Sequence, residues 1–360
     1  MTGAGAHRPV VPPAARPGDR IAVVSPSFAA PGRWPAVHEQ ALRRLAELTG
    51  LVPVEYPTTR QLGASPQERA RDLNAAFSDP EVRAVIATLG GDDQLRVIPH
   101  LDRDAVLADP KPFLGYSDNT NLLHWLWSAG VGGFYGGSTQ VHLGPGPRVD
   151  DIHALSLRAA LLGGVQLELS DPGESEDYGT DWGDQRALSE TGEREPTTGF
   201  AWAGPARSVT GTTWGGCLEV VDWILLADRF PFPPAALEGA VLLLETSELT
   251  PPAQWVRYTL RALGERGLLA PLAGVLAARP PVSTFEHRPE AAERERLRAA
   301  QRDAVIETVA EYNPDAVVCV GVPFGHTTPQ WIVPYGGSIT LDGRTRRVFA
   351  DYRRTEARGG

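Results

Sequence analysis

The sequence predicts an α/β protein whose N-terminal part is built on a parallel sheet of the flavodoxin or Rossmann type. Two observations support this class. Short apolar segments alternate with segments whose apolar residues recur at helical spacing, and a long polar stretch separates two such regions. The chain has 360 residues, of which 42% are hydrophobic, and this is sufficient for two domains with well-filled cores.

Strands and helices alternate through the N-terminal region. Apolar runs predict strands at residues 20–25, 51–56, 84–89 and 111–116. Helical spacing and helix-start residues predict helices at 34–48, from Ser65-Pro66 onward, and at 118–128. Because the strands of βαβ units are parallel, their carboxyl ends share one edge of the sheet, where ligands of α/β proteins bind.

A second region follows a helix predicted at 151–162. Residues 170–204 are rich in Gly, Pro, Thr and acidic residues and include Trp182 and Trp202, a composition typical of a linker or a functional loop. Short strands then return at 209–213, 240–244, 274–278, 316–320, 338–341 and 347–350, with helices at 218–227, 252–264 and 289–312. We therefore expect an N-terminal domain at 1–165, a Trp-containing connecting segment at 166–205 and a C-terminal domain at 206–360.

Charge and cysteine content exclude several classes of protein. The formal charge is -10 and no basic run occurs, which argues against a nucleic-acid-binding protein. Cys217 and Cys319 stand alone in apolar contexts, so neither a disulfide framework nor a Cys-rich zinc site is expected. The N-terminus lacks the features of a signal peptide, and no run of about 18 apolar residues is present. We expect a soluble cytoplasmic protein without a membrane partner.

Ser117 lies in Gly115-Tyr116-Ser117-Asp118-Asn119, between a predicted buried strand and a predicted helix. A tight turn at this place exposes the hydroxyl, and the helix N-terminus offers free N–H groups to an oxyanion. The pattern is similar to the GxSxG nucleophile turn but lacks its second glycine. The same position also suits a serine that only caps the following helix.

Two other apolar strands also end in residues that serve acyl transfer. The strand at 240–244 leads into Glu245, and the strand at 316–320 leads into Gly325-His326. A serine, a histidine and a carboxylate at three strand ends could form a triad in which His326 takes the serine proton and Glu245 orients the imidazole. Glu248 is a second candidate for the orienting role, and Glu245 could instead pair with a surface arginine.

In their order and spacing these segments resemble the LD-carboxypeptidase family of serine peptidases. The matching segments are 18–27, 88–93, 111–118, 242–248 and 321–327. The resemblance implies a Ser117, Glu245 and His326 triad, no metal or other cofactor, and a homodimer. It also implies a C-terminal α/β domain with a small barrel-like sheet and an active site between the two domains.

The Gly90-Gly91-Asp92-Asp93 turn corresponds to the family segment that faces the nucleophile. The resemblance implies an oxyanion hole formed by the backbone amides of Gly91 or Asp92 and of Asp118. A GGD turn also occurs in kinases, where it contacts phosphates, so a phosphotransferase is a rival interpretation. That interpretation leaves Ser117 and His326 without a role.

The family has two branches that differ in substrate. One removes D-alanine from a murein tetrapeptide. The other, typified by the microcin C immunity protein, cleaves an aminoacyl- or peptidyl-nucleotide amide and stacks a loop tryptophan on the base. Trp182 and Trp202 in the connecting segment and the Glu245–Glu248 sequence favour the second branch, and Cys217 replaces an asparagine that is common in relatives. We predict that Trp182, Trp202, Cys217 and Glu248 bind substrate in a hydrolase of this second branch. A murein carboxypeptidase and a non-catalytic sequestering protein are the remaining alternatives.

Overall fold

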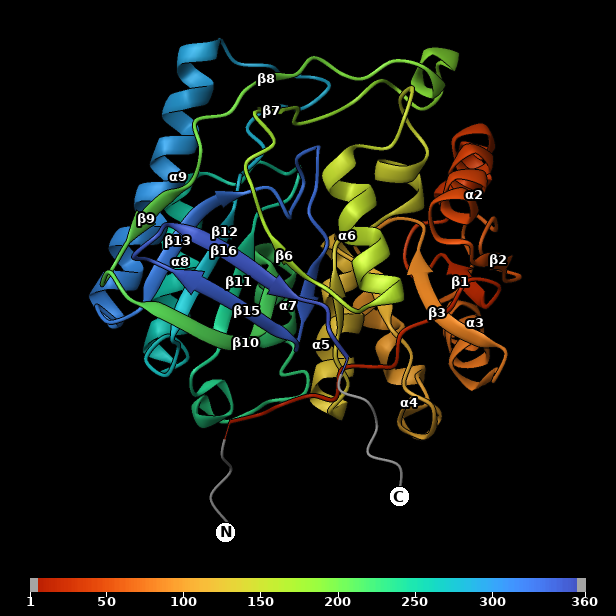
Figure 1. Cartoon of the computed structure of the whole chain (residues 1–360), viewed down its shortest axis with the longest axis horizontal. Coiled ribbons are helices and arrows are strands. Elements are labelled where there is room, and N and C mark those ends of the chain that lie inside the picture. The colour runs from red at the N-terminus through yellow and green to blue at the C-terminus, as the bar shows by residue number, and fades with distance from the viewer. Residues whose placement is uncertain (1–5, 355–360) are drawn as a thin grey trace.

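The computed structural model describes residues 6–354, and its core contains two sheets (Figure 1). The N-terminal sheet has the strand order β14-β5-β4-β3-β1-β2. Its strands are β1 (Arg20–Val24), β2 (Val52–Glu55), β3 (Val82–Ala87), β4 (Phe113–Gly115), β5 (Gly133–Tyr135) and β14 (Val333–Tyr335). All neighbouring strands are parallel except β14, which pairs antiparallel with β5. The predicted parallel sheet is therefore confirmed.

Six α-helices within residues 6–354 accompany this sheet. They are α1 (Ala30–Arg33), α2 (Pro35–Thr49), α3 (Pro66–Ser78), α4 (Arg103–Ala108), α5 (Thr120–Ala129) and α6 (Asp151–Leu162). Four of them lie at predicted positions, whereas α1 and α4 were not predicted. The start of α3 is a complete capping box, because Ser65 accepts from the Glu68 N–H and the Glu68 carboxylate accepts from the Ser65 N–H. Helix α2 ends at Gly50, whose left-handed conformation with φ 72° suits glycine.

The C-terminal sheet curls into a half-barrel of eight strands in the order β6-β16-β15-β10-β11-β12-β13-β9 (Figure 1). The strands are β6 (Gln166–Glu168), β9 (Ala201–Ala203), β10 (Ser208–Cys217), β11 (Val241–Glu245), β12 (Gly274–Ala278), β13 (Val317–Val322), β15 (Ser338–Asp342) and β16 (Arg347–Asp351). Strands β10 to β13 pair in parallel and the remaining pairs are antiparallel. The helices of this half are α7 (Leu218–Leu226), α8 (Ala253–Glu265) and α9 (Ala291–Tyr312). The predicted α/β fold class with a barrel-like second sheet is confirmed.

Two strands of the N-terminal sheet were not predicted, and one of them comes from the far end of the chain. Strands β5 and β14 have three residues each, which is too short for a periodic signal. Through β14, the C-terminal part of the chain completes the sheet from which the Ser117 turn projects. The two sheets are thus joined by a strand as well as by packing.

The connecting segment between β6 and β9 crosses the top of the molecule in Figure 1 and contacts both halves. It includes the small hairpin of β7 (Glu174–Ser175) and β8 (Glu195–Pro196). At one end the ring of Trp182 packs edge-on against Trp34, with 5.2 Å between centroids. At the other end the segment is held by charged side chains from the C-terminal half.

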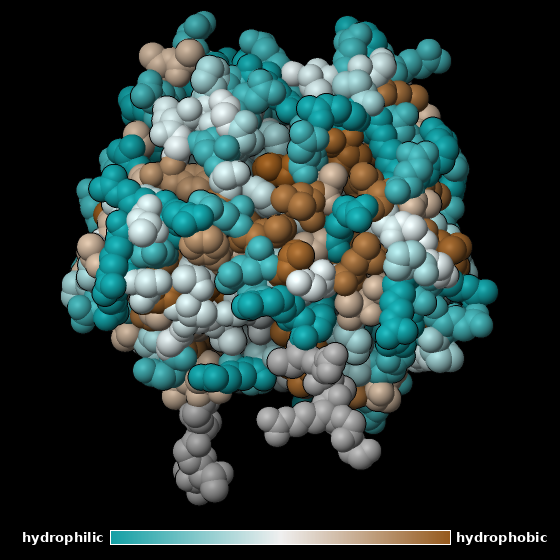
Figure 2. All heavy atoms as spheres, in the orientation of Figure 1, coloured by the Kyte–Doolittle hydropathy of each residue, from teal (hydrophilic) through white to brown (hydrophobic). Residues whose placement is uncertain are grey.

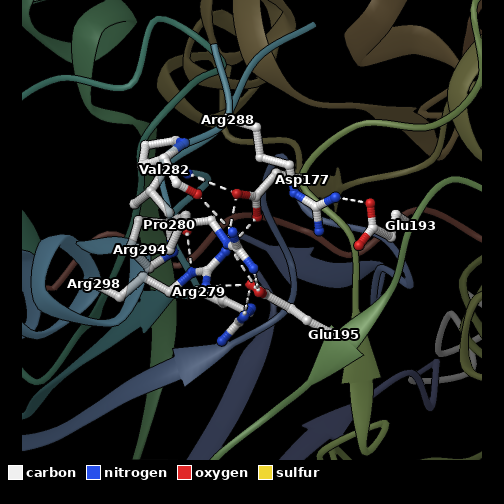
Figure 3. A network of polar contacts seen from close by, with 10 residues as sticks. Asp177, Glu193, Glu195, Arg279, Pro280, Val282, Arg288, Arg294 and Arg298 are labelled. Carbon is white, nitrogen blue, oxygen red and sulfur yellow. Dashed lines mark hydrogen bonds and ion pairs between the residues drawn. The ribbon is translucent and has the colours of Figure 1, made fainter. Parts of the chain in front are cut away.

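These charged side chains form a network, which we call the arginine network, shown in Figure 3. Glu195 accepts from Arg294, Arg298 and Arg279, and Asp177 accepts from Arg298 at 2.8 Å and from the backbone N–H of Val282 at 3.0 Å. Asp177 is buried, and the three arginine side chains are at most 14% exposed. The segment that the sequence presents as a loop is therefore fixed to β12 and α9.

In the direction of Figure 1 the surface is mostly hydrophilic at its margin, and hydrophobic residues gather near its centre (Figure 2). Within residues 6–354, none of the helices combines the length and apolar character that a membrane crossing requires.

Candidate active site

Ser117 stands at the sharp turn between β4 and α5. Its φ of 63° is left-handed, a conformation that costs a non-glycine residue about 1 kcal/mol or more. Tyr116 and Asp118 on either side are buried, whereas Ser117 is partly exposed. The Ser117 side chain caps neither the 3₁₀ turn Ser117–Asn119 nor α5. The helix-cap interpretation therefore does not account for this residue, and the strained turn presents its hydroxyl outward.

The turn is held from beneath by the side chain of Asp118. This carboxylate accepts from the Ser27 hydroxyl at 2.5 Å, the Gln94 N–H at 2.9 Å and the Asn121 amide at 2.9 Å. Burial raises the pKa of Asp118, and the hydrogen bonds from Ser27 and Gln94 oppose that shift. A fixed Asp118 side chain also fixes the direction of its backbone N–H.

His326 and Glu245 are directly hydrogen-bonded. The distance from His326 Nδ1 to Glu245 Oε2 is 2.7 Å, and the Glu245 carboxylate is fully buried at the end of β11. A Cβ atom on Gly325 would lie 2.6 Å from Glu245 Oε2, so glycine is required beside the histidine. The His326 ring packs edge-on against Tyr116, with 4.9 Å between centroids. Glu245 is therefore hydrogen-bonded to His326, and it pairs with no arginine among residues 6–354.

Tyr135 connects this pair to the nucleophile turn. Its hydroxyl donates to Glu245 Oε1 at 2.5 Å and accepts from the Ser117 N–H at 3.3 Å. Burial, followed by the charge of Glu245, raises the Tyr135 pKa well above its usual range, so the hydroxyl stays a donor. Sequence reasoning missed Tyr135 because β5 is short. A tyrosine closing a strand next to β4 was the only available signal.

The carboxylate of Glu248 contacts the second ring nitrogen of His326, Nε2. Its Oε2 lies 3.1 Å from His326 Nε2, and its side chain is 70% exposed. Burial alone would lower the pKa of His326, but the carboxylates of Glu245 and Glu248 raise it to about 9. Within residues 6–354 the Ser117 hydroxyl and His326 form no hydrogen bond, and the nitrogen that would accept the serine proton faces Glu248. In this structure the candidate base therefore contacts Glu245 and Glu248.

The Gly90-Gly91 turn approaches Ser117 through Gly90. A Cβ atom on Gly90 would lie 2.8 Å from Ser117 Cβ and 3.3 Å from the Asp118 N, whereas one on Gly91 would meet Ser27. In the described part of the chain, the N–H groups of Gly91, Asp92 and Asp118 make no hydrogen bond outside their own elements. They are available as donors, and the oxyanion hole remains a prediction.

Both halves of the chain match one known family. The LD-carboxypeptidase N-terminal domain matches residues 21–136, and the LD-carboxypeptidase C-terminal domain matches residues 210–341. This chain belongs to the LD-carboxypeptidase family. The resemblance inferred from the motifs is confirmed.

Three relatives from this family illustrate the similarity. A putative carboxypeptidase of Vibrio cholerae is 26% identical over 92% of this chain and 95% of its own length. The microcin C7 self-immunity protein MccF of Escherichia coli is 29% identical over 50% of this chain and 52% of its length. The structure of MccF in complex with glutamyl sulfamoyl guanosine has a TM-score of 0.80, at 20% identity over 95% of this chain and 98% of that one. An MccF-like protein from Streptococcus pneumoniae in complex with AMP has a TM-score of 0.80, at 27% identity over 93% and 99% of the two chains.

Cys217 lies beside Glu245, its register partner across β10 and β11 in this LD-carboxypeptidase-family chain. Its thiol is buried and donates to Glu219 Oε2 at 3.3 Å. Burial, with the charges of Glu245 and Glu219, raises the pKa of the thiol well above its usual range. A buried, protonated thiol is a poor nucleophile, which agrees with Cys217 as a small packing residue at the site wall.

The two tryptophans of the connecting segment lie in different settings. Trp202 is part of β9 and pairs with Cys319 of β13, and its side chain is half-buried against the core. Trp182 is half-buried on Trp34 of the N-terminal half. Trp182 lies in a turn, whereas Trp202 belongs to a strand.

Proposed function

We propose that this protein is a serine hydrolase that cleaves an amide through Ser117, His326 and Glu245. The observation that carries the proposal is the Glu245–His326 hydrogen bond of 2.7 Å, joined through Tyr135 to a serine in a left-handed turn. A serine, a base and an orienting acid that converge from three strand ends are the groups that acyl transfer needs.

In the proposed reaction His326 Nε2 accepts the Ser117 hydroxyl proton as Oγ attacks the carbonyl carbon. The N–H groups of Asp118 and of Gly91 or Asp92 stabilise the oxyanion. His326 then gives the proton to the leaving nitrogen, and the C–N bond breaks to leave an acyl group on Ser117. A water molecule, deprotonated by the same nitrogen, hydrolyses this ester. For the first step the Glu248 carboxylate must move away from Nε2.

We propose an aminoacyl- or peptidyl-nucleotide amide as the substrate class. MccF has been solved with glutamyl sulfamoyl guanosine, and the related Streptococcus protein with AMP. In this chain the connecting segment supplies Trp182 as an aromatic ring for a base, and stacking contributes about 1–3 kcal/mol per base. The corresponding biological role would be resistance to an antibiotic of the microcin type.

Murein tetrapeptide cleavage is the second candidate, because the first curated relative and the family itself are carboxypeptidases. Mass spectrometry of reactions with a murein tetrapeptide and with aspartyl sulfamoyl adenosine separates the two. If D-alanine is released from the tetrapeptide and the nucleotide compound stays intact, the proposed nucleotide substrate class is contradicted. A requirement for a nucleoside triphosphate and Mg²⁺ would instead support the phosphotransferase.

The triad is tested by Ser117→Ala and His326→Ala, which should each abolish turnover while the fold is retained. A serine-directed phosphonate should label Ser117 in the wild type, and a purely sequestering protein would not be labelled. Full activity of Ser117→Ala on any substrate that the wild type cleaves would refute the mechanism.

We also propose that the chain forms a homodimer. Helices α7 and α8 lie side by side, with the Trp255 indole donating to Asp222, and together they expose Leu226 (88%), Trp255 (46%) and Tyr258 (54%). Light scattering should give twice the chain mass, and Leu226→Lys together with Tyr258→Lys should give a monomer.

A further inference from the structure

Glu248 contacts the candidate base but takes no part in the bond-making and bond-breaking steps of the proposed mechanism. It lies in the turn after β11, three residues beyond Glu245, and its Oε2 is 3.1 Å from His326 Nε2. That nitrogen must approach Ser117 Oγ to about 3 Å for proton transfer. Glu248 thus contacts the ring nitrogen that the proposed mechanism needs for Ser117.

Three carboxylates, those of Glu219, Glu245 and Glu248, surround the His326 ring. Buried Glu219 accepts from the Ser247 hydroxyl and N–H, and its charge, with those of Glu245 and Glu248, raises the His326 pKa. In the part of the chain that the structure describes, no arginine or lysine lies within 4.0 Å of these three carboxylates. The only lysine in the sequence, Lys111, is buried on backbone carbonyls at the end of α3.

The Glu248 side of this contact is open to solvent. Its side chain is 70% exposed, whereas the His326 side chain is 9% exposed. A competing cation therefore reaches the carboxylate directly from solvent. Once Glu248 leaves, the ring keeps its hydrogen bond to Glu245 and loses one of the carboxylates that raise its pKa.

We infer that Glu248 recognises a free α-ammonium group on the acyl residue of the substrate, and that this pairing releases His326 Nε2 for Ser117. The α-ammonium is the cation that any aminoacyl amide carries next to its scissile carbonyl, two bonds from the carbon that Ser117 attacks. A group in that position falls within reach of a carboxylate that lies 3.1 Å from Nε2. The inference rests on the proposed hydrolase and narrows its substrates from peptidyl to aminoacyl amides.

The test compares two substrates that differ only in this charge. Alanyl sulfamoyl adenosine carries the α-ammonium, and lactyl sulfamoyl adenosine has a hydroxyl of similar size in its place. For the wild type we expect kcat/KM to be at least about tenfold higher for the alanyl compound, as a charge-assisted contact would give. In Glu248→Gln the ratio should fall to near one. The control Glu311→Gln, an exposed glutamate on α9, should keep the wild-type ratio.

Each other outcome has a defined meaning. Equal cleavage of both compounds by the wild type, or an unchanged ratio in Glu248→Gln, would overturn the inference while the proposed hydrolase stands. If neither nucleotide compound is cleaved, the nucleotide substrate is wrong, and alanyl- and lactyl-D-alanine are compared in the same way. A preference for the alanyl compound that depends on Glu248 would uphold the inference in that series. The absence of cleavage in both series would contradict the inference and the proposed function together.

Discussion

The hydroxyl of Tyr135 donates to Glu245 at 2.5 Å. Tyr135 closes β5 of the N-terminal sheet and Glu245 closes β11 of the C-terminal sheet, so this hydrogen bond joins the two halves of the molecule. The same hydroxyl accepts from the Ser117 N–H. One side chain is therefore hydrogen-bonded both to the turn that carries Ser117 and to the carboxylate that contacts His326.

Replacing Tyr135 with Phe should lower kcat about 10- to 100-fold with little change in KM, because substrate contacts stay and the triad loses its alignment. The ring should still pack between Phe324 and Tyr335. Tyr335→Phe is a matched control, since its buried hydroxyl donates to the Gly215 carbonyl at 3.2 Å. Each variant should lose about 1–2 kcal/mol of unfolding free energy in a denaturant titration. Equal kcat losses in the two variants would show that Tyr135 has no positioning role.

The pH dependence of kcat/KM should report His326. Its pKa is raised to about 9, so the ring is protonated in the free protein at neutral pH and kcat/KM should rise as the pH approaches 9. The groups around the ring are the carboxylates of Glu245, Glu248 and Glu219, with buried Tyr116 and His142 beside them. Glu248→Gln removes one negative charge and should shift the rise of kcat/KM to lower pH. A rise at the same pH in both proteins would show that Glu248 does not act on His326.

The free energy of unfolding should also depend on the protonation of His326. Because the folded-state pKa of His326 lies above the usual value of 6.5, the protonated ring stabilises the fold fully below about pH 6.5. This contribution is lost as the pH rises through about 9. Urea titrations give the free energy of unfolding of the wild type and of His326→Gln at pH 6 and at pH 9.5. The difference between the two proteins should be larger at pH 6. A larger difference at pH 9.5 would contradict the direction of the pKa shift.

Gly90→Ala should reduce turnover more than 100-fold, on the order of 3 kcal/mol, because the added Cβ would lie 2.8 Å from Ser117 Cβ and 3.0 Å from its Oγ. The nucleophile would have to shift. Gly179→Ala is the control, since an added Cβ there has no atom within 4 Å in the described structure. Circular dichroism would verify that both variants are folded. Normal turnover by Gly90→Ala would mean that the GGD turn is not in contact with the working nucleophile.

Arg298→Met should release the connecting segment from the arginine network (Figure 3). Buried Asp177 would lose its arginine partner, and breaking a buried ion pair costs about 3–5 kcal/mol, less here because Arg279 and Arg294 still contact Glu195. Hydrogen exchange should accelerate across 170–204. Arg302→Met, on the exposed side of the same helix, is the control. Equal exchange in the two variants would show that the network does not anchor the segment.

The sequence by itself predicted the longer strands and helices and the candidate triad. Repeating apolar patterns predict strands and helices because burial acts on neighbouring residues, and strand ends indicate which polar side chains reach the edge of a sheet. Ser117, Glu245 and His326 could be proposed for that reason. The resemblance of the surrounding segments to one family added their roles.

The tertiary structure decided what joins these residues. Tyr135 meets Glu245, which is 110 positions away, and Arg298 meets Asp177 at 121 positions, and no local pattern encodes such pairings. Both Glu245 and Glu248 follow the same strand, so the sequence left the orienting role open between them. Geometry assigned Nδ1 of His326 to the first and Nε2 to the second. The physical reason is that burial patterns specify which residues go inside, whereas side-chain partners depend on how separate strands are brought together in space.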